Sequence, residues 1–204
     1  MKETAAEHYN AKYPDRPGLT YSHGWLTGVW CIGNMFGNAV SFYGAYPRGY
    51  LQRVHSMFPN AQRVLHVFSG SLTIEQAAAV APNAQTIELV DLRNTESGCY
   101  PTWQGNVVSL PDAWHGYFDL ILADPPYSRA DAQKYDVPML NRGRATRALR
   151  RVVAPGGVLV WLDQVWPMHR KADWKCWGHV AVVRSTNHRV RLASFFEATD
   201  AEAV

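Results

Sequence analysis

The chain has 204 residues and a formal net charge of +3, from 20 basic and 17 acidic side chains. This length suits one sizeable α/β domain and leaves little room for two. Hydrophobic residues make up 47% of the chain and charged residues 18%, which excludes a disordered polypeptide. The charge is too small to indicate nucleic-acid binding by itself, so evidence for it must come from local clusters of basic residues.

The cysteines give a further bound on the class of protein. Cys31, Cys99 and Cys176 lie far apart, and none belongs to a C-x-x-C pair. This spacing argues against a structural zinc site and against a disulfide framework. The polar start is not a signal peptide, and no apolar run is long enough to cross a membrane. We therefore expect a cytoplasmic protein with no metal and no membrane partner.

Residues 1–45 are rich in glycine and aromatic residues and show no clean helical period. They predict loops and a hairpin, packed by their rings, as an N-terminal extension. From residue 46 onward, strand-like segments alternate with helical ones. The expected helices cover residues 47–58, with Pro47 as the first helical residue, 73–79 and 142–153. The expected strands cover residues 64–68, 87–91, 107–109, 118–123, 158–162, 179–184 and 190–196. This order predicts a parallel sheet with right-handed crossovers, closed by an antiparallel hairpin.

The segment from Leu120 to Tyr127 (LILADPPY) is the most informative part of the chain. Its apolar half predicts a buried strand. The two prolines cannot continue a ladder of backbone hydrogen bonds, so the chain must leave the sheet at Asp124. The prolines also stiffen the loop while keeping their carbonyl acceptors. The result is a rigid rim at the carboxyl edge of a sheet, with acceptors beside an aromatic ring. Such a rim suits a planar group that carries an NH2.

These four residues, Asp124-Pro125-Pro126-Tyr127, resemble the catalytic motif of the S-adenosylmethionine-dependent amino-methyltransferases, chiefly the DNA adenine-N6 enzymes. The resemblance covers nearly everything from Tyr46 onward. It implies an α/β class I methyltransferase Rossmann-like fold, with a seven-stranded, mostly parallel sheet and an antiparallel C-terminal hairpin strand. Residues 1–204 would then be a single methyltransferase domain, with residues 46–204 as its catalytic core.

The resemblance also implies a role for each residue of the motif. The Asp124 carboxylate and the Pro125 carbonyl grip the two hydrogens of the adenine amino group, while Pro126 helps to stiffen the loop. Gripping both hydrogens localises the nitrogen lone pair, which can then attack the sulfonium methyl group in line. Tyr127 stacks on the target base, which must leave its helix to reach the site.

A cofactor site is expected at the carboxyl ends of the first two core strands, where α/β sheets bind ligands. The turn after the first strand resembles the family's Phe-x-Gly motif, which holds the methionine part of S-adenosylmethionine. Asp91 ends the next strand and can accept both ribose hydroxyls. An amide at position 106 stands near the family's adenine-reading acid. The residues expected to bind the cofactor are Tyr46, Pro47, Phe68, Ser69, Gly70, Ser71, Asp91, Leu92, Asn106 and Asp124.

Two residues depart from the family pattern. His66 stands where the family often has an acidic residue, and Leu72 where it often has a second glycine. We expect His66 to pack or hydrogen-bond inside the sheet, and Leu72 to crowd the turn. Both departures bear on cofactor affinity rather than on the fold.

Basic residues cluster in three zones after the catalytic motif: the helix at 142–153, the segment around residue 170, and the closing hairpin. Such clusters are often solvated surface, but their density also favours phosphate contact. The residues expected to bind nucleic acid are Arg144, Arg147, Arg151, Arg170, Lys171, Arg189 and Arg191. The chain has no room for a separate target-recognition domain. We therefore expect low or very short sequence specificity, or a partner protein or homodimer that supplies it.

Three functions remain open on the sequence alone. The favoured one is methyl transfer to adenine N6 in DNA. The alternative within the same chemistry is an RNA methyltransferase that acts on guanine N2 or adenine N6 of ribosomal RNA. The third is a non-catalytic nucleic-acid-binding relative that has lost its cofactor, which only His66 and Leu72 support. Cytosine N4 is less favoured because its enzymes more often begin the motif with Ser.

Overall fold

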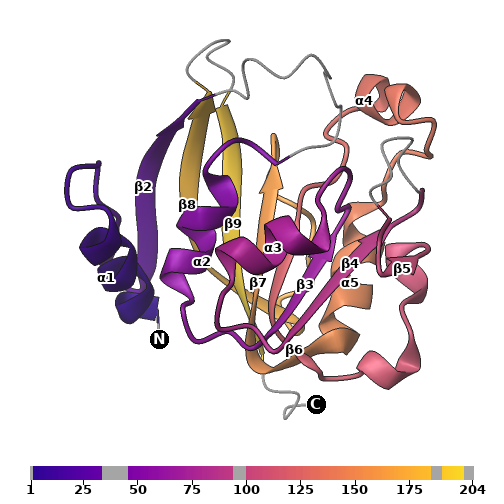
Figure 1. Ribbon diagram of the computed structural model, residues 1–204, viewed down its shortest axis with the longest axis horizontal. Coiled ribbons are helices and arrows are strands. Elements are labelled where there is room, and N and C mark those ends of the chain that lie inside the picture. The colour runs from indigo at the N-terminus through magenta and orange to yellow at the C-terminus, as the bar shows by residue number, and fades with distance from the viewer. Residues whose placement is uncertain (1, 34–45, 94–99, 185–189, 200–204) are drawn as a thin grey trace.

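The computed structural model describes residues 2–33, 46–93, 100–184 and 190–199 (Figure 1). Its helices are α1 (Lys2–Lys12), α2 (Tyr50–Met57), α3 (Ile74–Val80), α4 (Arg129–Lys134) and α5 (Arg142–Val152). Its strands are β1 (Thr20–Ser22), β2 (Trp25–Ile32), β3 (Arg63–Val67), β4 (Thr86–Asp91), β5 (Trp103–Gln104), β6 (Phe118–Ala123), β7 (Val153–Asp163), β8 (Trp174–Arg184) and β9 (Val190–Ala198). Two short 3-10 helices, η1 (Val107–Ser109) and η2 (Asp112–Trp114), lie between β5 and β6.

Within the described residues, one mixed sheet runs in the order β1-β2-β8-β9-β7-β6-β3-β4-β5. Strands β5, β4, β3, β6 and β7 are parallel, and β9 pairs antiparallel with both β7 and β8. The mostly parallel sheet with an antiparallel C-terminal hairpin is therefore confirmed. The expected number of seven strands is wrong, because the sheet has nine.

The two additional strands come from the N-terminal extension. β2 adds to β8 in parallel, and β1 folds back on β2 as the expected hairpin. Along β2, Leu26, Trp30 and Ile32 are buried against the helices, while alternate residues face away. Gly178 makes the pairing close: a Cβ at this position would lie 2.3 Å from the Leu26 Cβ. A glycine in β8 thus lets the extension complete the sheet.

Helices cover the sheet on both faces (Figure 1). α1, α2 and α3 pack on one face in a core that includes Tyr9, Val54 and Ala77. α5 packs on the other face, where Leu149 meets Trp161 and Phe118. Successive residues of β3, β6 and β7 point into the two cores in turn, because side chains alternate along a strand. Two apolar layers therefore hold the carboxyl edge of the sheet in place.

Several helices begin as the sequence predicts. Thr73 accepts a hydrogen bond from the Gln76 N–H, and the Gln76 side chain accepts from the Thr73 N–H, which is the expected capping box of α3. Asn141 caps α5 by accepting from the Arg144 N–H at 3.0 Å. α2, by contrast, begins at Tyr50 rather than at Pro47, because Gly49 before it has a left-handed φ of 78°, a conformation that suits glycine and does not continue a helix.

Two local predictions are wrong. Residues 107–109 form the 3-10 helix η1 rather than a strand, because the Asn106 side chain caps this turn by accepting from the Val108 N–H at 3.1 Å. The strand in this region is the two-residue β5, which pairs with the end of β4. Residues 2–12 form α1, although the sequence predicted only loops and a hairpin before residue 46.

The described residues contain neither a membrane-spanning helix nor a cluster of metal-binding side chains. None of their helices has the length and apolar character that a bilayer span requires. No group of three or more His, Cys, Asp or Glu side chains in the same part of the chain could hold a metal ion.

Candidate active site at the carboxyl edge of the sheet

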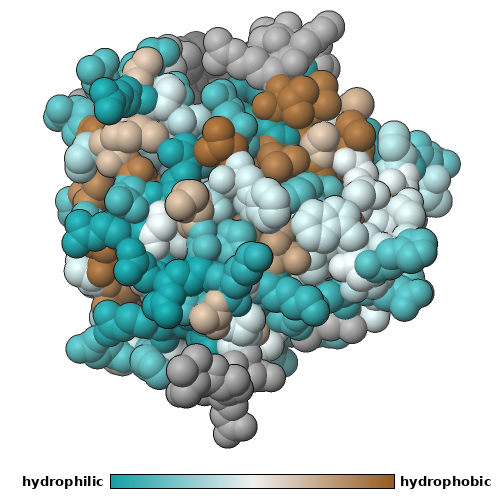
Figure 2. Space-filling view, turned by 180° about the vertical axis from the view of Figure 1, so that it is seen from behind, coloured by the Kyte–Doolittle hydropathy of each residue, from teal (hydrophilic) through white to brown (hydrophobic). Residues whose placement is uncertain are grey.

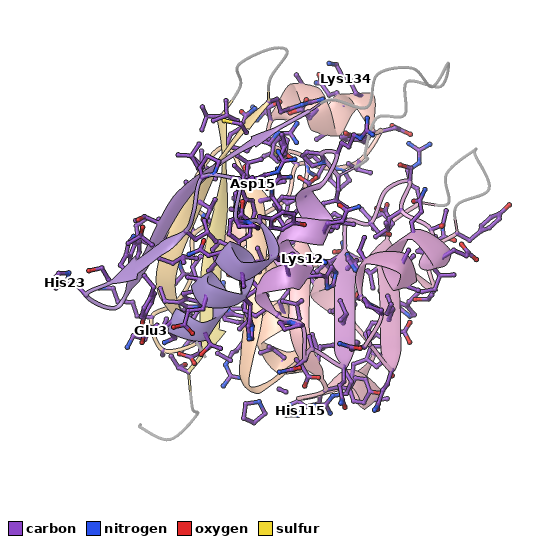
Figure 3. All side chains as sticks on the ribbon, turned by 60° about the vertical axis from the view of Figure 1, so that its left-hand side comes forward. Glu3, Lys12, Asp15, His23, His115 and Lys134 are labelled. Atoms are coloured by element: carbon purple, nitrogen blue, oxygen red, sulfur yellow. The ribbon has the colours of Figure 1, made fainter. Side chains whose placement is uncertain are left out.

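The carboxyl ends of β3, β4, β6 and β7 meet at one edge of the sheet, the upper edge in Figure 1. α4 lies at this edge, and Figure 3 shows its Lys134 at the top of the molecule. His115, just before β6, lies at the opposite, lower edge in the same view. Asp91 ends β4, Asp124 follows β6, and residues 68–71 form the turn after β3, so these predicted site residues lie at the upper edge.

The turn after β3 is tight and tied to the neighbouring strand. Phe68 and Gly70 both have positive φ, of 59° and 55°, which is uncommon for a residue as bulky as Phe. The Ser69 N–H donates to the Val90 carbonyl at 3.1 Å, and the Gly70 N–H donates to the Asp91 carboxylate at 2.9 Å. The turn and Asp91 are thus held as one unit.

Of the two departures from the family pattern, His66 packs inside the sheet as expected, whereas Leu72 does not behave as expected. Leu72 does not crowd the turn: it is buried in the apolar core under α2 and α3, and its N–H donates to the Ser69 carbonyl at 3.0 Å. His66 is fully buried, with its ring 5.9 Å from those of Tyr46 and His55. Burial, with His55 as a smaller cause, lowers the pKa of His66 to about 3. His66 is therefore a neutral residue of the interior, not a substitute for the family's acid.

A cavity of about 200 Å³ opens beside Asp91. Its lining includes five residues that the sequence proposed for the cofactor site or placed beside it: Phe68, Asp91, Leu92, Asn106 and Pro126. This volume is below the about 300–1,000 Å³ of most small-molecule sites, so the cavity suits one part of a cofactor. Its walls are mainly apolar, with a carboxylate at one end. These features fit a nucleoside whose base enters an apolar slot while its ribose meets an acid.

Two of the polar residues that line the cavity, Asp91 and Asn106, already have backbone partners. The two Asp91 oxygens accept from the Gly70 and Arg93 N–H groups, at 2.9 Å and 3.2 Å. Each carboxylate oxygen has a second lone pair, so hydroxyl groups can still bind there. The Asn106 oxygen accepts from the Val108 N–H, which leaves its second lone pair and its NH2 group for a base.

Sequence reasoning missed one wall of this cavity. Residues 137–141, between α4 and α5, lie across it from Asp91 and contribute Val137, Met139 and Leu140. The signal was an apolar run with a proline, Val137-Pro138-Met139-Leu140, between two helices. A loop with this composition needs a surface to cover, and here it covers the cavity.

The Asp124–Tyr127 motif forms a corner at the end of β6. The Tyr127 hydroxyl donates a hydrogen bond to one oxygen of the Asp124 carboxylate. Burial and the nearby Asp163 raise the pKa of Asp124 to about 6, against the lowering effects of Arg191, of the Tyr127 bond and of Arg184. The Arg191 guanidinium lies over the Tyr127 ring, 4.5 Å from its centroid. Arg191, which the sequence placed on a nucleic-acid surface, is thus part of this corner.

A buried ion pair fixes the far side of the motif. Arg142, the first residue of α5, donates to both oxygens of Asp163, at 2.7 Å and 3.1 Å. The same guanidinium donates to the Tyr127 carbonyl at 3.0 Å. Asp163 is fully buried and also accepts from the Trp161 indole and the Gln164 N–H. A fully hydrogen-bonded carboxylate at the end of β7 therefore positions the loop that follows β6.

Two tyrosines below the corner carry buried hydroxyl groups. The rings of Tyr46 and Tyr50 are stacked, with centroids 5.7 Å apart. Both side chains are buried, yet neither hydroxyl has a hydrogen-bond partner within the described part of the chain. Asp124 raises the pKa of both hydroxyls, after burial itself. Asp91 also raises the pKa of Tyr46, whereas Arg191 lowers that of Tyr50.

Arg144, Arg147 and Arg151 lie on one side of α5, as their spacing requires, but their surroundings differ. Arg144 lines the cavity, and Arg147 is exposed beside it. Arg151 lies about 10 Å further along the helix and pairs with Asp112 in an exposed ion pair.

The other predicted nucleic-acid residues are dispersed. Arg170 and Lys171 lie at the opposite edge of the sheet, just before the start of β8, where the Trp174 N–H donates to the Arg170 carbonyl. Arg189 lies outside the described residues. Of the expected set, the structure brings only Arg144 and Arg191 to the candidate site.

Exposed apolar side chains lie near the corner. Val165 and Trp166 follow Asp163 closely, and Val190 precedes Arg191; each is about half exposed, at 50%, 52% and 55%. Figure 2 shows the face opposite α1–α3, where hydrophobic residues gather toward the upper edge among hydrophilic ones. A protein surface seldom groups such side chains without a partner.

Comparison with known proteins places the fold. No family model matches the chain, and no curated protein matches it in sequence. The structure is similar to the 1,6-didemethyltoxoflavin-N1-methyltransferase of Burkholderia thailandensis, solved with S-adenosylhomocysteine, with a TM-score of 0.54 and 13% identity over 75% of this chain and 78% of that one. It is also similar to the N-methyltransferase NodS of Bradyrhizobium japonicum WM9 with S-adenosylhomocysteine, with a TM-score of 0.50 and 15% identity over 74% and 84% of the chains. The chain therefore has a methyltransferase-like α/β fold, extended by two strands.

Proposed function

We propose that this protein transfers a methyl group from S-adenosylmethionine to the exocyclic amino group of a nucleic-acid base, with adenine N6 in DNA as the favoured target. The observation that carries the proposal is the position of the Asp124–Tyr127 corner next to a nucleoside-sized cavity that contains Asp91. Asp91 would bind the ribose of the methyl donor, and Asp124, beside the Tyr127 ring, would bind the amino group of the acceptor base. The two ligands would then lie next to each other. The two N-methyltransferases of similar fold contain S-adenosylhomocysteine, the demethylated cofactor, which supports this choice of donor.

The residues of the cavity fit the cofactor. Asp91 would accept the ribose hydroxyls, the cavity beside Asn106 would hold the adenine, and the turn at Gly70 would carry the methionine part. The unpartnered Tyr46 hydroxyl, between Asp91 and Asp124, would bind the amino-acid end. When bound, the cofactor supplies an electrophilic methyl group on a sulfonium. The protein supplies position and electrostatics.

The corner supplies the acceptor side. An amino group entering it would replace the Tyr127 hydroxyl on the Asp124 oxygen and place its second hydrogen on the Pro125 carbonyl. Tyr127, released from Asp124, could then stack on the base, which is worth about 1–3 kcal/mol. The ionised Asp124 carboxylate accepts the amine hydrogen bond more strongly than the neutral acid does, and only the ionised form can take the proton that the amine loses after transfer.

The proposal of a nucleic-acid acceptor rests on the groups around the corner. Arg144 and Arg191 offer cations for phosphates, and Trp166 offers an exposed ring for a base. These few contacts suit a substrate read with low or short sequence specificity. A partner protein or a second copy of the chain would supply any longer recognition.

A labelling experiment tests the proposal. The protein is incubated with tritiated S-adenosylmethionine and unmethylated DNA or ribosomal RNA, and the polymer is digested to nucleosides. We expect label in N6-methyl-2′-deoxyadenosine of the DNA arm. Label in guanosine of the RNA arm would replace the acceptor while keeping the chemistry.

The matched control is Asp124→Ala, which should abolish transfer while leaving calorimetric binding of S-adenosylhomocysteine within about twofold. Absence of binding at millimolar ligand would contradict the proposal and favour a non-catalytic protein.

A further inference from the structure

The hydroxyl of Tyr50 is one of the buried, unpartnered polar groups near the corner. Tyr50 is 0% exposed, and its hydroxyl has no hydrogen-bond partner in the described ranges. Its ring is held from two sides, by the stacked Tyr46 ring and by the edge of Trp30 at 6.0 Å. The side chain therefore cannot turn its hydroxyl out to water. Leaving such a group unpaired costs about 1–3 kcal/mol, which favours a hydrogen-bond partner that comes from outside the described residues.

The surroundings of this hydroxyl indicate where that partner binds. Asp124 raises the Tyr50 pKa and Arg191 lowers it, so the hydroxyl lies in the field of both side chains. Arg191 also covers the Tyr127 ring. Tyr50 is thus on the acceptor side of the corner, whereas Tyr46 lies toward Asp91. Its strongly raised pKa keeps Tyr50 protonated, hence a hydrogen-bond donor, at any pH where the protein works.

We propose that Tyr50 positions the acceptor base by donating a hydrogen bond to the ring nitrogen next to its amino group. In adenine this atom is N1, which carries a lone pair directly beside N6. With Asp124 and the Pro125 carbonyl on the two amine hydrogens, the Tyr50 hydroxyl would fix the base in its plane. The assignment deepens the proposed function and rests on it.

The proposed hydrogen bond from Tyr50 to adenine N1 can be tested with base analogues that lack N1. A site that contains a buried donor rejects a ligand lacking the matching acceptor, because the donor is then left unpaired. 1-Deazaadenine has a C–H in place of N1 and keeps the amino group. 7-Deazaadenine keeps N1 and serves as the matched analogue control.

The experiment combines these analogues with the variant Tyr50→Phe. The oligonucleotide that the wild-type protein methylates is prepared with adenine, 1-deazaadenine or 7-deazaadenine at the methylated position, and kcat/KM is measured. For the wild-type protein we expect about a tenfold loss with 1-deazaadenine and little change with 7-deazaadenine. Tyr50→Phe should show about the same tenfold loss on adenine and little further loss on 1-deazaadenine.

A second readout separates this role from a structural one. Because Tyr50→Phe removes an unpaired buried hydroxyl, it should raise the melting temperature of the free protein or leave it unchanged. The control Tyr117→Phe should lower it without altering the analogue ratios, since the Tyr117 hydroxyl pairs with Thr86 at 3.1 Å, at the opposite edge of the sheet. A lower melting temperature for Tyr50→Phe would overturn the assignment. So would a further tenfold loss of kcat/KM when Tyr50→Phe is given 1-deazaadenine, because the two losses would then be independent. Failure of the proposed function is distinguishable, because the wild-type protein itself would then transfer no label to any base, and the Tyr50 assignment would fall with it.

Discussion

The guanidinium of Arg142 donates a hydrogen bond of 3.0 Å to the main-chain carbonyl of Tyr127. It does so while forming a two-pronged pair with the buried Asp163. The first residue of α5 therefore fixes the position of the loop that follows β6 relative to the end of β7. The contact joins two segments that the sequence separates by 15 residues.

Arg142→Lys should reduce turnover more than cofactor binding. Lysine keeps the charge but cannot hold Asp163 and the Tyr127 carbonyl at once, because its ammonium lacks the planar fork. We expect kcat to fall about 10- to 100-fold, because a displacement of about 1 Å in the residues that hold a substrate can cost about 100-fold in rate. Binding of S-adenosylhomocysteine, measured calorimetrically, should stay within about twofold.

The control for this variant is Arg63→Lys. Arg63 forms a comparable pair with Asp119 at the opposite edge of the sheet. It should cost stability and leave kcat unchanged below the melting transition. Equal losses of kcat in both variants would show that Arg142 acts only through general stability.

Activity should depend on the ionisation of Asp124. Its pKa is raised to about 6, and only the carboxylate accepts both an amine hydrogen and, later, a proton. kcat/KM should therefore rise as the pH increases through about 6 and level off above it. Asp124→Asn should lower the rate about 10²- to 10⁴-fold and abolish this acid limb. A profile that stays flat down to pH 5 would contradict the role.

Removing the cation at position 191 should move this profile. Arg191 lowers the pKa of Asp124, so Arg191→Gln should raise that pKa and shift the acid limb to higher pH. Arg191→Lys keeps a positive charge and should shift it less. The pH dependence of kcat/KM for the three proteins is the measurement. An unchanged limb in Arg191→Gln would show that the guanidinium acts on Tyr127 alone.

The buried histidines should make the protein sensitive to acid. The pKa of His66 is lowered to about 3 and that of His55 to about 4, both mainly by burial. Between these values and about 6.5 the unfolded chain binds more protons than the folded one, so stability is lost as the pH falls. Each group can contribute up to about 1.4 kcal/mol per pH unit in this range.

His66→Leu isolates one of these contributions. The variant should lose less stability than the wild-type protein between pH 7 and pH 5. The opposite effect of Asp124, whose raised pKa favours the folded state at low pH, is common to both proteins and cancels. Urea titrations at the two pH values give the comparison. An equal loss in both proteins would show that His66 can take up a proton inside the fold.

Much of the site could be predicted because its signals are local. Gly70, Asp91 and Asp124 each end or follow an apolar strand, and the carboxyl ends of parallel strands meet at one edge whatever the details of packing. The structure does bring these residues together at the upper edge. Their roles toward a cofactor and a base remain proposals.

The rest depended on contacts between distant segments. Arg142 belongs to a run of arginines that resembles a solvated helix face, and only the position of Asp163 reveals its inward contact. Arg191 was assigned to a surface because nothing nearby in the sequence shows that β9 begins beside β7. The unpartnered hydroxyl of Tyr50 is likewise invisible until the burial of the ring is known.

The helix and strands of the N-terminal extension were difficult to predict for another reason. Residues 2–12 contain three alanines and no glycine or proline, which is a helix signal, but the polar composition gives no clear apolar face. In β2, Gly28 and aromatic residues on both faces obscure the alternation of buried and exposed side chains. The sequence therefore predicted a hairpin without showing that it would join the sheet.

The outermost strands of the sheet, β1 and β5, have only three and two residues. Without the extension, the eleven-residue β8 would have ended the sheet and offered a long row of free N–H and C=O groups. Such a row is a template on which other chains can aggregate. Residues 20–32 thus cover the edge of β8, so a variant that lacks them should aggregate more readily than the full chain.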